Sequence, residues 1–298
     1  MNIPKYAITH AGVFHGDDVF ATAFLKKVNP EIRWFRANDP EKKIKSLMDQ
    51  YNIKVTDTIV YDVGGGEFDH HQKNTIEYRY PDTNALPYSS FGKIVRAFYP
   101  FIMSNEMYAI FDRELVVPID YQDCKGRLFK GDRNELSHAI SLFNPNWNED
   151  PSDTFRNKQF SLAVNFASSI IGRTLKKCES LILSEGIVKN AMERMAPNQG
   201  YMVLDQYVNY GSYVAPHPHI RWAIYPSIRG GFQVFSCGDK NLHNRDIFSP
   251  EEIAELSKME SCLFVHPAGF TASFHTLEDA VEYMKKVCMR LPIEIRNV

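Results

Sequence analysis

Four short segments of the sequence concentrate the side chains that proteins use to hold divalent cations. Imidazole nitrogens and carboxylate oxygens together suit a hard or borderline ion such as Mn²⁺, Mg²⁺, Fe²⁺ or Zn²⁺. Within these segments there is no cysteine, which argues against a structural zinc site. The pattern therefore predicts a metal centre that performs chemistry. The segments are His10-xxxx-His15-x-Asp17, Asp62, Asp69-His70-His71 and Asp120-xx-Asp123.

The number of ligands predicts two ions. Six or seven such side chains are more than one ion needs, whereas two ions about 3.5–4 Å apart that share a carboxylate would use them all. Such pairs are a common device for phosphoryl hydrolysis, because they activate water and stabilise charge on the phosphoryl oxygens. Asp62 is the predicted bridging ligand, since it ends the apolar run 58–62. The expected cofactor is a pair of divalent ions, with Mn²⁺ preferred and Mg²⁺ as the alternative.

Several of these residues, and the glycines near them, also have a simpler interpretation. A lone histidine after a strand, such as His10, is more often a hydrogen-bonded structural residue. Asp17 and Asp18 could cap the helix that begins there, where carboxylates favour the helix dipole. The glycines Gly64-Gly65-Gly66 could form only a tight turn. The metal interpretation is favoured because four independent segments are each rich in ligands and lie near predicted strand or helix ends.

Predicted strands and helices alternate in the first third of the chain and would position these ligands. Strands separated by helices are typical of an α/β fold, with a mainly parallel sheet flanked by helices. Functional groups gather at the carboxyl ends of such strands, so ligands far apart in sequence can meet there. The predicted strands are 6–9, 31–35 and 58–62, and the predicted helices are 17–28 and 41–48.

A domain boundary is predicted at 196–200, where Pro197 and Gly200 follow a mainly helical stretch in which Asp153 could cap a long helix. Beyond the boundary the pattern changes to short strands, with helices capped by Ser249 and Thr276. We therefore expect a metal-dependent domain at 1–195 and a smaller α+β substrate-binding domain at 200–298. The strands predicted in the second domain are 201–204, 220–225, 232–236 and 262–265.

Composition excludes some classes of protein. Lys and Arg number 34 against 36 Asp and Glu in 298 residues, so a strongly basic protein that coats nucleic acid is excluded. The five cysteines are dispersed without a CxxC pair, which is typical of free thiols in a reducing compartment. No signal or transit peptide is recognisable, and no apolar run approaches the roughly 20 residues of a membrane span. We expect a cytoplasmic protein that does not contact membranes.

Five motifs spread over nearly the whole chain carry a resemblance to a known family. They are Thr9-His-Ala-Gly-Val-Phe-His-Gly-Asp17, Asp62-Val-Gly-Gly-Gly66, Phe68-Asp-His-His-Gln72, Phe143-Asn-Pro-Asn-Trp-Asn148 and Phe264-Val-His-Pro-Ala-Gly-Phe270. The Asp-His-His motif, preceded by Asp62 and by the first motif, resembles the DHH phosphoesterases. The whole set resembles, more closely, the melanocyte-proliferating-gene family of RNA exonucleases within that superfamily.

The resemblance implies a two-domain enzyme in which the N-terminal domain holds the metals and the C-terminal domain closes on the substrate. His15 stands where the wider superfamily has aspartate, so it either replaces a ligand or contacts the substrate. In the fourth segment Asp123 is the favoured ligand, and Asp120 is kept as a residue that supports the ligands. The predicted metal set is His10, His15, Asp17, Asp62, His70, Asp123 and Asp120, and the predicted catalytic set is Asp62, His71 and Asp69.

Substrate contacts are predicted in the second domain. The segment 211–245 has a local excess of three positive charges among interleaved aromatic residues, a pattern that suits a single nucleic-acid strand. The alternative is that Trp222 and its aromatic neighbours form strand core and that Gly230-Gly231 is a hairpin turn. By resemblance, the segment 266–270 is a glycine-rich substrate loop. The predicted substrate-binding residues are His266, Gly269, Arg229 and Arg245.

The function predicted from all this is a divalent-metal-dependent phosphodiesterase. We expect an exonuclease that releases nucleotides from single-stranded RNA or an oligonucleotide, with 3′–5′ polarity, by means of a metal-activated water. One alternative is hydrolysis of a small phosphate compound such as pyrophosphate, a dinucleotide or a nucleotide. Another is a non-catalytic RNA- or nucleotide-binding protein of the same fold. The sequence leaves open the polarity of degradation, the choice of RNA or DNA, the native metal and the oligomeric state.

Overall fold

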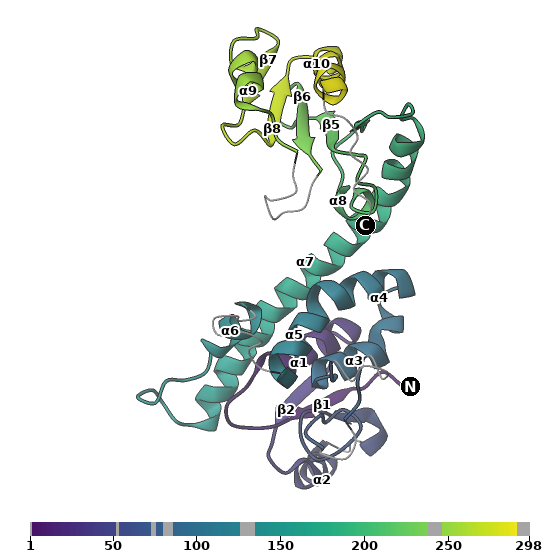
Figure 1. Cartoon of the computed structure of the whole chain (residues 1–298). Helices are drawn as coiled ribbons and strands as arrows, with labels where there is room; N and C mark the ends of the chain where they lie inside the picture. Colours follow the sequence, from purple (N-terminus) through teal and green to yellow (C-terminus); the bar gives the residue numbers. More distant parts are fainter. Residues whose placement is uncertain are drawn as a thin grey trace. The chain divides into compact units, whose positions relative to one another are not determined.

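A computed structural model describes residues 2–51, 54–72, 76–79, 86–125, 135–237 and 246–290 of the chain. The structure divides into two compact units, Met1–Cys178 and Glu179–Val298 (Figure 1). The division falls inside the long helix α7, Asp153–Glu193, rather than at 196–200. The assignment of a metal-dependent and a substrate-binding domain stays a prediction.

The first unit contains a three-stranded parallel sheet, as the alternation of strands and helices predicts. Its strand order is β2-β1-β3, and β1 is parallel to both neighbours. The central strand is fully buried at Ala7, Ile8 and Thr9, because helices cover its faces. The strands are β1 (Tyr6–Thr9), β2 (Arg33–Arg36) and β3 (Thr58–Val60).

Helix α1 is buried from Gly16 to Leu25, and the helices α3, α5 and α6 pack against it. Ser152 caps the long helix α7, because its hydroxyl accepts a hydrogen bond from the backbone N–H of Phe155. The predicted cap, Asp153, is instead the first residue of the helix. The helices are α1 (Gly16–Val28), α2 (Pro40–Tyr51), η1 (Val55–Asp57), α3 (Ser90–Phe98), η2 (Tyr99–Phe101), α4 (Asn105–Phe111), the π-helical η3 (Asp112–Val116), α5 (Val117–Lys125) and α6 (Glu135–Ser141).

The second unit is built on a five-stranded mixed sheet of order β4-β5-β6-β8-β7. The pair β4 and β5 is parallel and the other neighbours are antiparallel. Strand β8 was not predicted from the sequence. The predicted helix capped by Ser249 is confirmed as α9, with a complete capping box. The elements are β4 (Tyr201–Val203), α8 (Gly211–Val214), β5 (Trp222–Pro226), β6 (Phe232–Ser236), α9 (Pro250–Leu256), β7 (Cys262–Val265), β8 (Thr271–Phe274) and α10 (Leu277–Arg290).

Two aromatic residues of strand β5 belong to the core of this unit. Trp222 is completely buried and stacks on Phe248 with ring centroids 4.5 Å apart. Tyr225 is also buried, and it packs against Tyr210. The strand-core interpretation is therefore confirmed for Trp222 and Tyr225, and neither ring has an open face for a nucleic-acid base. No helix in the described part of the chain is long and apolar enough to cross a membrane.

The turn between β5 and β6 generates a stability prediction. Gly230 and Gly231 have φ values of 92° and 66°, where an L side chain is strained by about 1–2 kcal/mol. A Cβ at Gly231 would also lie 2.1 Å from the backbone oxygen of Phe274, whereas at Gly230 it would meet no described atom within 4 Å. We expect Gly231→Ala to lower the free energy of unfolding by about 1–3 kcal/mol more than Gly230→Ala. Urea unfolding followed by circular dichroism measures both, and equal losses would contradict the close-packing argument.

Candidate metal centre

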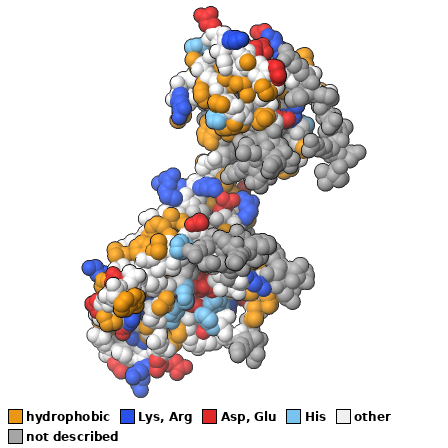
Figure 2. Space-filling model, turned by 60° about the vertical axis from the view of Figure 1, so that its left-hand side comes forward, with side chains coloured by type: hydrophobic (Ala, Val, Ile, Leu, Met, Phe, Trp, Pro, Cys, Tyr) orange, Lys and Arg blue, Asp and Glu red, His pale blue; other side chains and the backbone are white. Residues whose placement is uncertain are grey.

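Ligand-type side chains from five segments meet at the carboxyl ends of β1 and β3. Because β1 and β3 are parallel neighbours, the residues that follow them emerge at the same edge of the sheet. The start of α1, the loop after β3 and the last turns of α5 complete the arrangement. On one face of the first unit, histidine and acidic side chains lie close together (Figure 2). The residues brought together are His10, His15, Asp17, Asp18, Asp62, His70, His71 and Asp123, with Cys124 beside them.

Asp62 lies at the centre of this cluster. Its Oδ1 is 3.1 Å from His70 Nε2, and its Oδ2 is 3.3 Å from His10 Nε2. Ser90 Oγ donates a hydrogen bond of 3.0 Å to Oδ1. The Asp62 backbone is left-handed, with φ 58°, and its N–H donates to the carbonyl of Phe68. The two carboxylate oxygens consequently face different partners.

His70 lies among three carboxylates. Besides Asp62, its Nε2 is 3.3 Å from Asp123 Oδ2 and 3.7 Å from Asp17 Oδ2. Asp17 and Asp123 form a further group with the exposed His15, whose ligand atoms all lie within 4.8 Å of one another. The structure therefore brings five of the predicted ligands close together, and His15 lies beside them on the exposed side. The five are His10, Asp17, Asp62, His70 and Asp123.

Asp120 lies apart from these ligand atoms. It is one helical turn before Asp123 on α5 and is directed towards α3. Its Oδ1 accepts hydrogen bonds from Ser89 Oγ and the backbone N–H of Gly92. Its Oδ2 accepts two from the guanidinium of Arg79, at 3.0 and 2.6 Å. Both oxygens are engaged, so in the structure Asp120 anchors α5 to α3 and Asp123 is the residue that faces His70.

Asp69 and His71 form a pair beside the cluster. His71 Nδ1 donates to Asp69 Oδ1 at 2.9 Å, and Asp69 also accepts from the backbone N–H groups of His71 and Gly65. Burial would raise the pKa of Asp69, but these hydrogen bonds outweigh it and lower the pKa. The His71 side chain is 63% exposed. Asp69 thus orients the His71 ring and leaves its Nε2 edge accessible.

His10 and His70 hold protons tightly when no cation is present. Burial would lower the pKa of His10, but the carboxylates of Asp62 and Asp18 raise it to about 9. The pKa of His70 is likewise raised to about 9 against burial, by Asp62, Asp17 and Asp123. Desolvation would raise the pKa of Asp62, but its contacts with His10 and His70 lower it strongly.

The other carboxylates resist ionisation because they are buried next to one another. Desolvation raises the pKa of Asp17 well above its usual value, and the charges of Asp62 and Asp123 raise it further. Desolvation also raises the pKa of Asp18, to about 7, and that of Asp123. Because of this repulsion, the carboxylates cannot all ionise together unless they receive more positive charge than His10 and His70 supply.

Unsatisfied oxygens show that the cluster fits divalent cations. Both carboxylate oxygens of Asp17, Oδ2 of Asp18 and Oδ2 of Asp62 are buried and accept no hydrogen bond from any described residue. Leaving one such oxygen unpaired costs about 1–3 kcal/mol or more. Cations bound among these oxygens and the imidazoles of His10 and His70 would satisfy them, and the donor set is one that Mn²⁺ or Mg²⁺ accepts.

A cavity of about 780 Å³ adjoins the cluster. His15, His70, His71 and Asp123 line it on the cluster side, and Tyr88 and other side chains complete the wall. This volume is within the range of small-molecule sites and could hold a nucleotide. The cavity gives a ligand direct access to the exposed edges of the ligand cluster.

The sequence analysis missed residues that support the site. Asp18 was considered only as a helix cap, although it is buried beside His10. Lys93 on α3 is buried, and its ammonium donates to the carbonyls of Glu67 and Asp69, which holds the loop that carries His70. The signal for Asp18 was its place directly after Asp17, and the signal for Lys93 was a charged residue within the apolar face of α3.

The predicted substrate residues of the second unit have varied surroundings. Arg229 is exposed in the turn between β5 and β6. His266 Nδ1 accepts a hydrogen bond from the N–H of Ala268. Gly269 has φ 71°, and its N–H donates to the carbonyl of His266, so this amide is engaged within the loop. Arg245 lies outside the described residues.

The pKa shifts generate a prediction about metal binding. Binding of Mn²⁺ to the metal-free protein should release at least about one proton per chain at pH 7, because His10 and His70 are protonated there and an imidazolium cannot coordinate. The affinity should rise as the pH increases from about 6 to about 9. Calorimetry in two buffers of different ionisation enthalpy measures the protons released. A binding enthalpy that is independent of the buffer would contradict the prediction.

Comparisons with known proteins assign the chain to a family. Residues 6–288 match the model MYG1_exonuc, described as "Uncharacterised protein family (UPF0160)". A MYG1 protein of Dictyostelium discoideum is 24% identical over an alignment of 315 residues, gaps included. The alignment covers 92% of this chain and 93% of the relative. A MYG1 exonuclease of Rattus norvegicus is 26% identical over 348 residues, 97% of this chain and 86% of the relative. A MYG1 protein of Chlamydia pneumoniae is 32% identical over 197 residues, 65% of this chain and 62% of the relative. The chain therefore belongs to the MYG1 family, UPF0160.

Proposed function

We propose that this protein is a divalent-metal-dependent phosphodiesterase of the DHH type, which releases nucleotides from an end of single-stranded RNA with 3′–5′ polarity. The observation that carries the proposal is the convergence of buried, unsatisfied carboxylates and two histidines at the sheet edge. The rat relative is named an exonuclease, which supports a nucleic-acid substrate. All five cysteines have free thiols, which supports a reducing compartment such as the cytoplasm.

The cluster would hold two divalent ions, preferably Mn²⁺. Asp62 is suited to bridge them, because Oδ2 faces His10 while Oδ1 faces His70. Bound ions of this kind supply positive charge that stabilises phosphoryl oxygens and lowers the pKa of water so that it can attack phosphorus. The proposed ligands are His10, Asp17, Asp62, His70 and Asp123, with His15 on the exposed side.

The protein's own residues position the ligands and the substrate. Ser90 and the left-handed backbone at Asp62 fix the direction of both carboxylate oxygens. Asp69 holds the His71 ring at the wall of the cavity, where its accessible edge can contact a phosphate or leaving-group oxygen. The cavity can hold the terminal nucleotide. In the second unit, the exposed Arg229 and the half-buried His266 stay predicted substrate contacts.

A small phosphate compound is the second candidate substrate. The burial of Trp222 and Tyr225 removes two of the aromatic rings that favoured a polymer. The cavity of about 780 Å³ is large enough for a dinucleotide or a nucleotide without further chain. The name of the rat relative and the exposed Arg229 favour RNA, so we retain RNA as the proposed substrate.

Substitution of the bridging carboxylate tests the metal-dependent reaction. Asp62→Asn should lower the rate of RNA hydrolysis with Mn²⁺ by at least about 10³-fold, because the amide cannot bridge two cations. Asp57→Asn is the matched control, since Asp57 lies just before β3 and pairs only with the exposed Lys5 at 3.3 Å among the described residues. The control should keep its rate within about twofold. Full hydrolysis by Asp62→Asn with unchanged metal content would refute the mechanism.

A substrate comparison tests the choice of RNA. With Mn²⁺, the turnover per KM of a single-stranded RNA 20-mer should exceed that of a dinucleotide and of pyrophosphate by at least about tenfold. The polymer rate should fall steeply with salt, because phosphate contacts release counterions. End-labelled RNA reports polarity, since mononucleotides released from the 3′ end shorten a 5′-labelled strand stepwise. Preference for pyrophosphate or the dinucleotide would replace RNA by the small substrate, and binding of RNA without any hydrolysis would indicate a non-catalytic protein.

A further inference from the structure

Asp18 is a buried carboxylate whose role as a helix cap accounts for only one of its two oxygens. Its Oδ1 accepts a hydrogen bond of 2.8 Å from the backbone N–H of His15, as a residue in the first turn of a helix can do. Its Oδ2 is buried and accepts no hydrogen bond within the described part of the chain. The side chain is 0% exposed, so water cannot satisfy this oxygen from outside. Capping therefore leaves a buried anionic oxygen unexplained.

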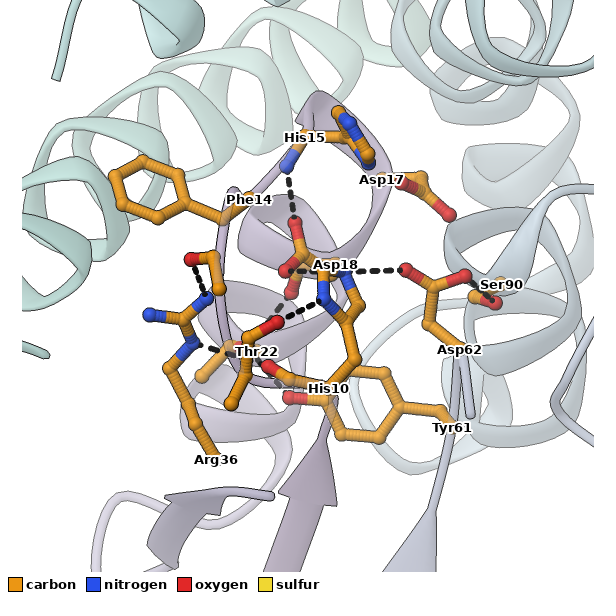
Figure 3. A network of polar contacts seen from close by, with 12 residues as sticks. His10, Phe14, His15, Asp17, Asp18, Thr22, Arg36, Tyr61, Asp62 and Ser90 are labelled. Carbon is orange, nitrogen blue, oxygen red and sulfur yellow. Dashed lines mark hydrogen bonds and ion pairs between the residues drawn. The ribbon is translucent and has the colours of Figure 1, made fainter. Parts of the chain in front are cut away.

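His10 directs its Nε2 atom at this oxygen. His10 Nδ1 lies 2.9 Å from the carbonyl of Ala11, and because a carbonyl only accepts, Nδ1 carries the hydrogen. In the neutral ring the lone pair is therefore on Nε2. That nitrogen is 3.3 Å from Asp18 Oδ2 and 3.3 Å from Asp62 Oδ2 (Figure 3). Once His10 has lost its second proton, as metal binding requires, three ligand atoms with lone pairs converge on one position, an arrangement that a cation stabilises.

The ligand atoms separate into two groups around Asp62. Asp62 Oδ2 belongs with His10 and Asp18, whereas Oδ1 belongs with His70. The His15 ring lies beside Asp17, and its ring centroid is 5.9 Å from that of His10 (Figure 3). His15 groups with Asp17 and Asp123, and its side chain is exposed. The ligand atom of His15 therefore belongs to the group with Asp17 and Asp123, whereas that of His10 belongs to the group with Asp18 and Asp62.

We propose that Asp18, and not His15, is the third protein ligand of the ion bound by His10 and Asp62. The position is then a His-Asp-Asp site for a hard divalent cation such as Mn²⁺ or Mg²⁺. It differs from the assignment that sequence spacing favours, in which His15 takes this place. The inference rests on the proposed metal centre but not on which phosphodiester the protein cleaves.

The surroundings hold this site in place. The Arg36 guanidinium donates to the carbonyls of His10 and Gly12, at 3.1 and 2.7 Å, and lies over the ring of Phe160. The Asp18 carbonyl accepts a hydrogen bond of 2.7 Å from the Thr22 hydroxyl. These contacts fix the segment after β1 against the start of α1. A ligand site with such supporting contacts needs little rearrangement to bind an ion.

Metal counting in the Asp123→Asn protein tests the assignment, because that change weakens the ion on the His70 side and leaves the His10 position to be measured. Equilibrium dialysis against Mn²⁺ gives the number of ions and their dissociation constant. Adding Asp18→Asn, which keeps an oxygen for the His15 N–H, should weaken the remaining ion by at least about 100-fold. Adding His15→Ala should change its affinity by less than about threefold. Retention of the ion by the Asp18 variant, or its loss in the His15 variant, would overturn the proposal.

Anomalous diffraction from wild-type crystals soaked in Mn²⁺ tests the same point without a substitution. A manganese peak within about 2.5 Å of Asp18 Oδ2, and close to His10 Nε2, is expected. An ion bound to His10 and Asp62 with Asp18 beyond about 3.5 Å would overturn the proposal, as would the absence of Mn²⁺ at saturating concentration. Both ions bound at full occupancy with no phosphodiester hydrolysed would overturn the proposed function and leave the assignment of Asp18 intact.

Discussion

The constraint on which the first unit depends is the crowding of four carboxylates, three of them buried, at one edge of its parallel sheet. Asp17, Asp18 and Asp62 are at most 3% exposed, and Asp123 lies against them. Removing such charges from water is unfavourable unless opposite charge replaces the lost hydration. His10 and His70, whose Nε2 atoms face these carboxyl groups, supply at most two positive charges among four acidic side chains. A fold that positions these residues so closely is therefore suited to cations from solution, which would offset the repulsion and perform the chemistry.

The basic residues near the cluster donate hydrogen bonds to backbone carbonyls and not to the carboxylates. The Lys93 ammonium bonds two carbonyls of the loop before His70, and Arg36 bonds two carbonyls after β1. Arg79, by contrast, pairs with Asp120 and Asp112 behind the site. Asp112 and Asp120, which anchor helices, are thus paired with an arginine. The carboxylates of the cluster receive no hydrogen bond from Lys93 or Arg36. The net charge of −2 for the whole chain conceals this difference, because the sum ignores position.

The sequence predicts the ligand-bearing edge well because its rules are local. Residues that follow short apolar runs, such as His10 and Asp62, must emerge where parallel strands end. Local rules fail where the outcome depends on tertiary contacts. Asp18 has the sequence of a helix cap, and only the approach of His10 and Asp62 shows its second oxygen to be a candidate ligand. The alternating aromatic residues of the second unit indicate a strand, but they do not show which face of the sheet is covered by other elements. The burial of Trp222 is therefore known only from the structure. Strand β8 is short, and pairing with β6 and β7 defines it more than its own composition does.

The backbone at Asp62 shows how position and chemistry are joined in one residue. Its φ of 58° costs most L residues about 1 kcal/mol or more, but Asp and Asn adopt this conformation more readily than others. The left-handed turn directs the chain away from β3 into the glycine-containing loop that returns to Phe68 and His70. It also leaves the carboxylate between His10 and His70 instead of on either face of the sheet. Asparagine would tolerate the backbone without the charge, and glutamate would keep the charge without the backbone preference. Aspartate satisfies both requirements, so the residue that turns the chain is also the one suited to bridge two ions.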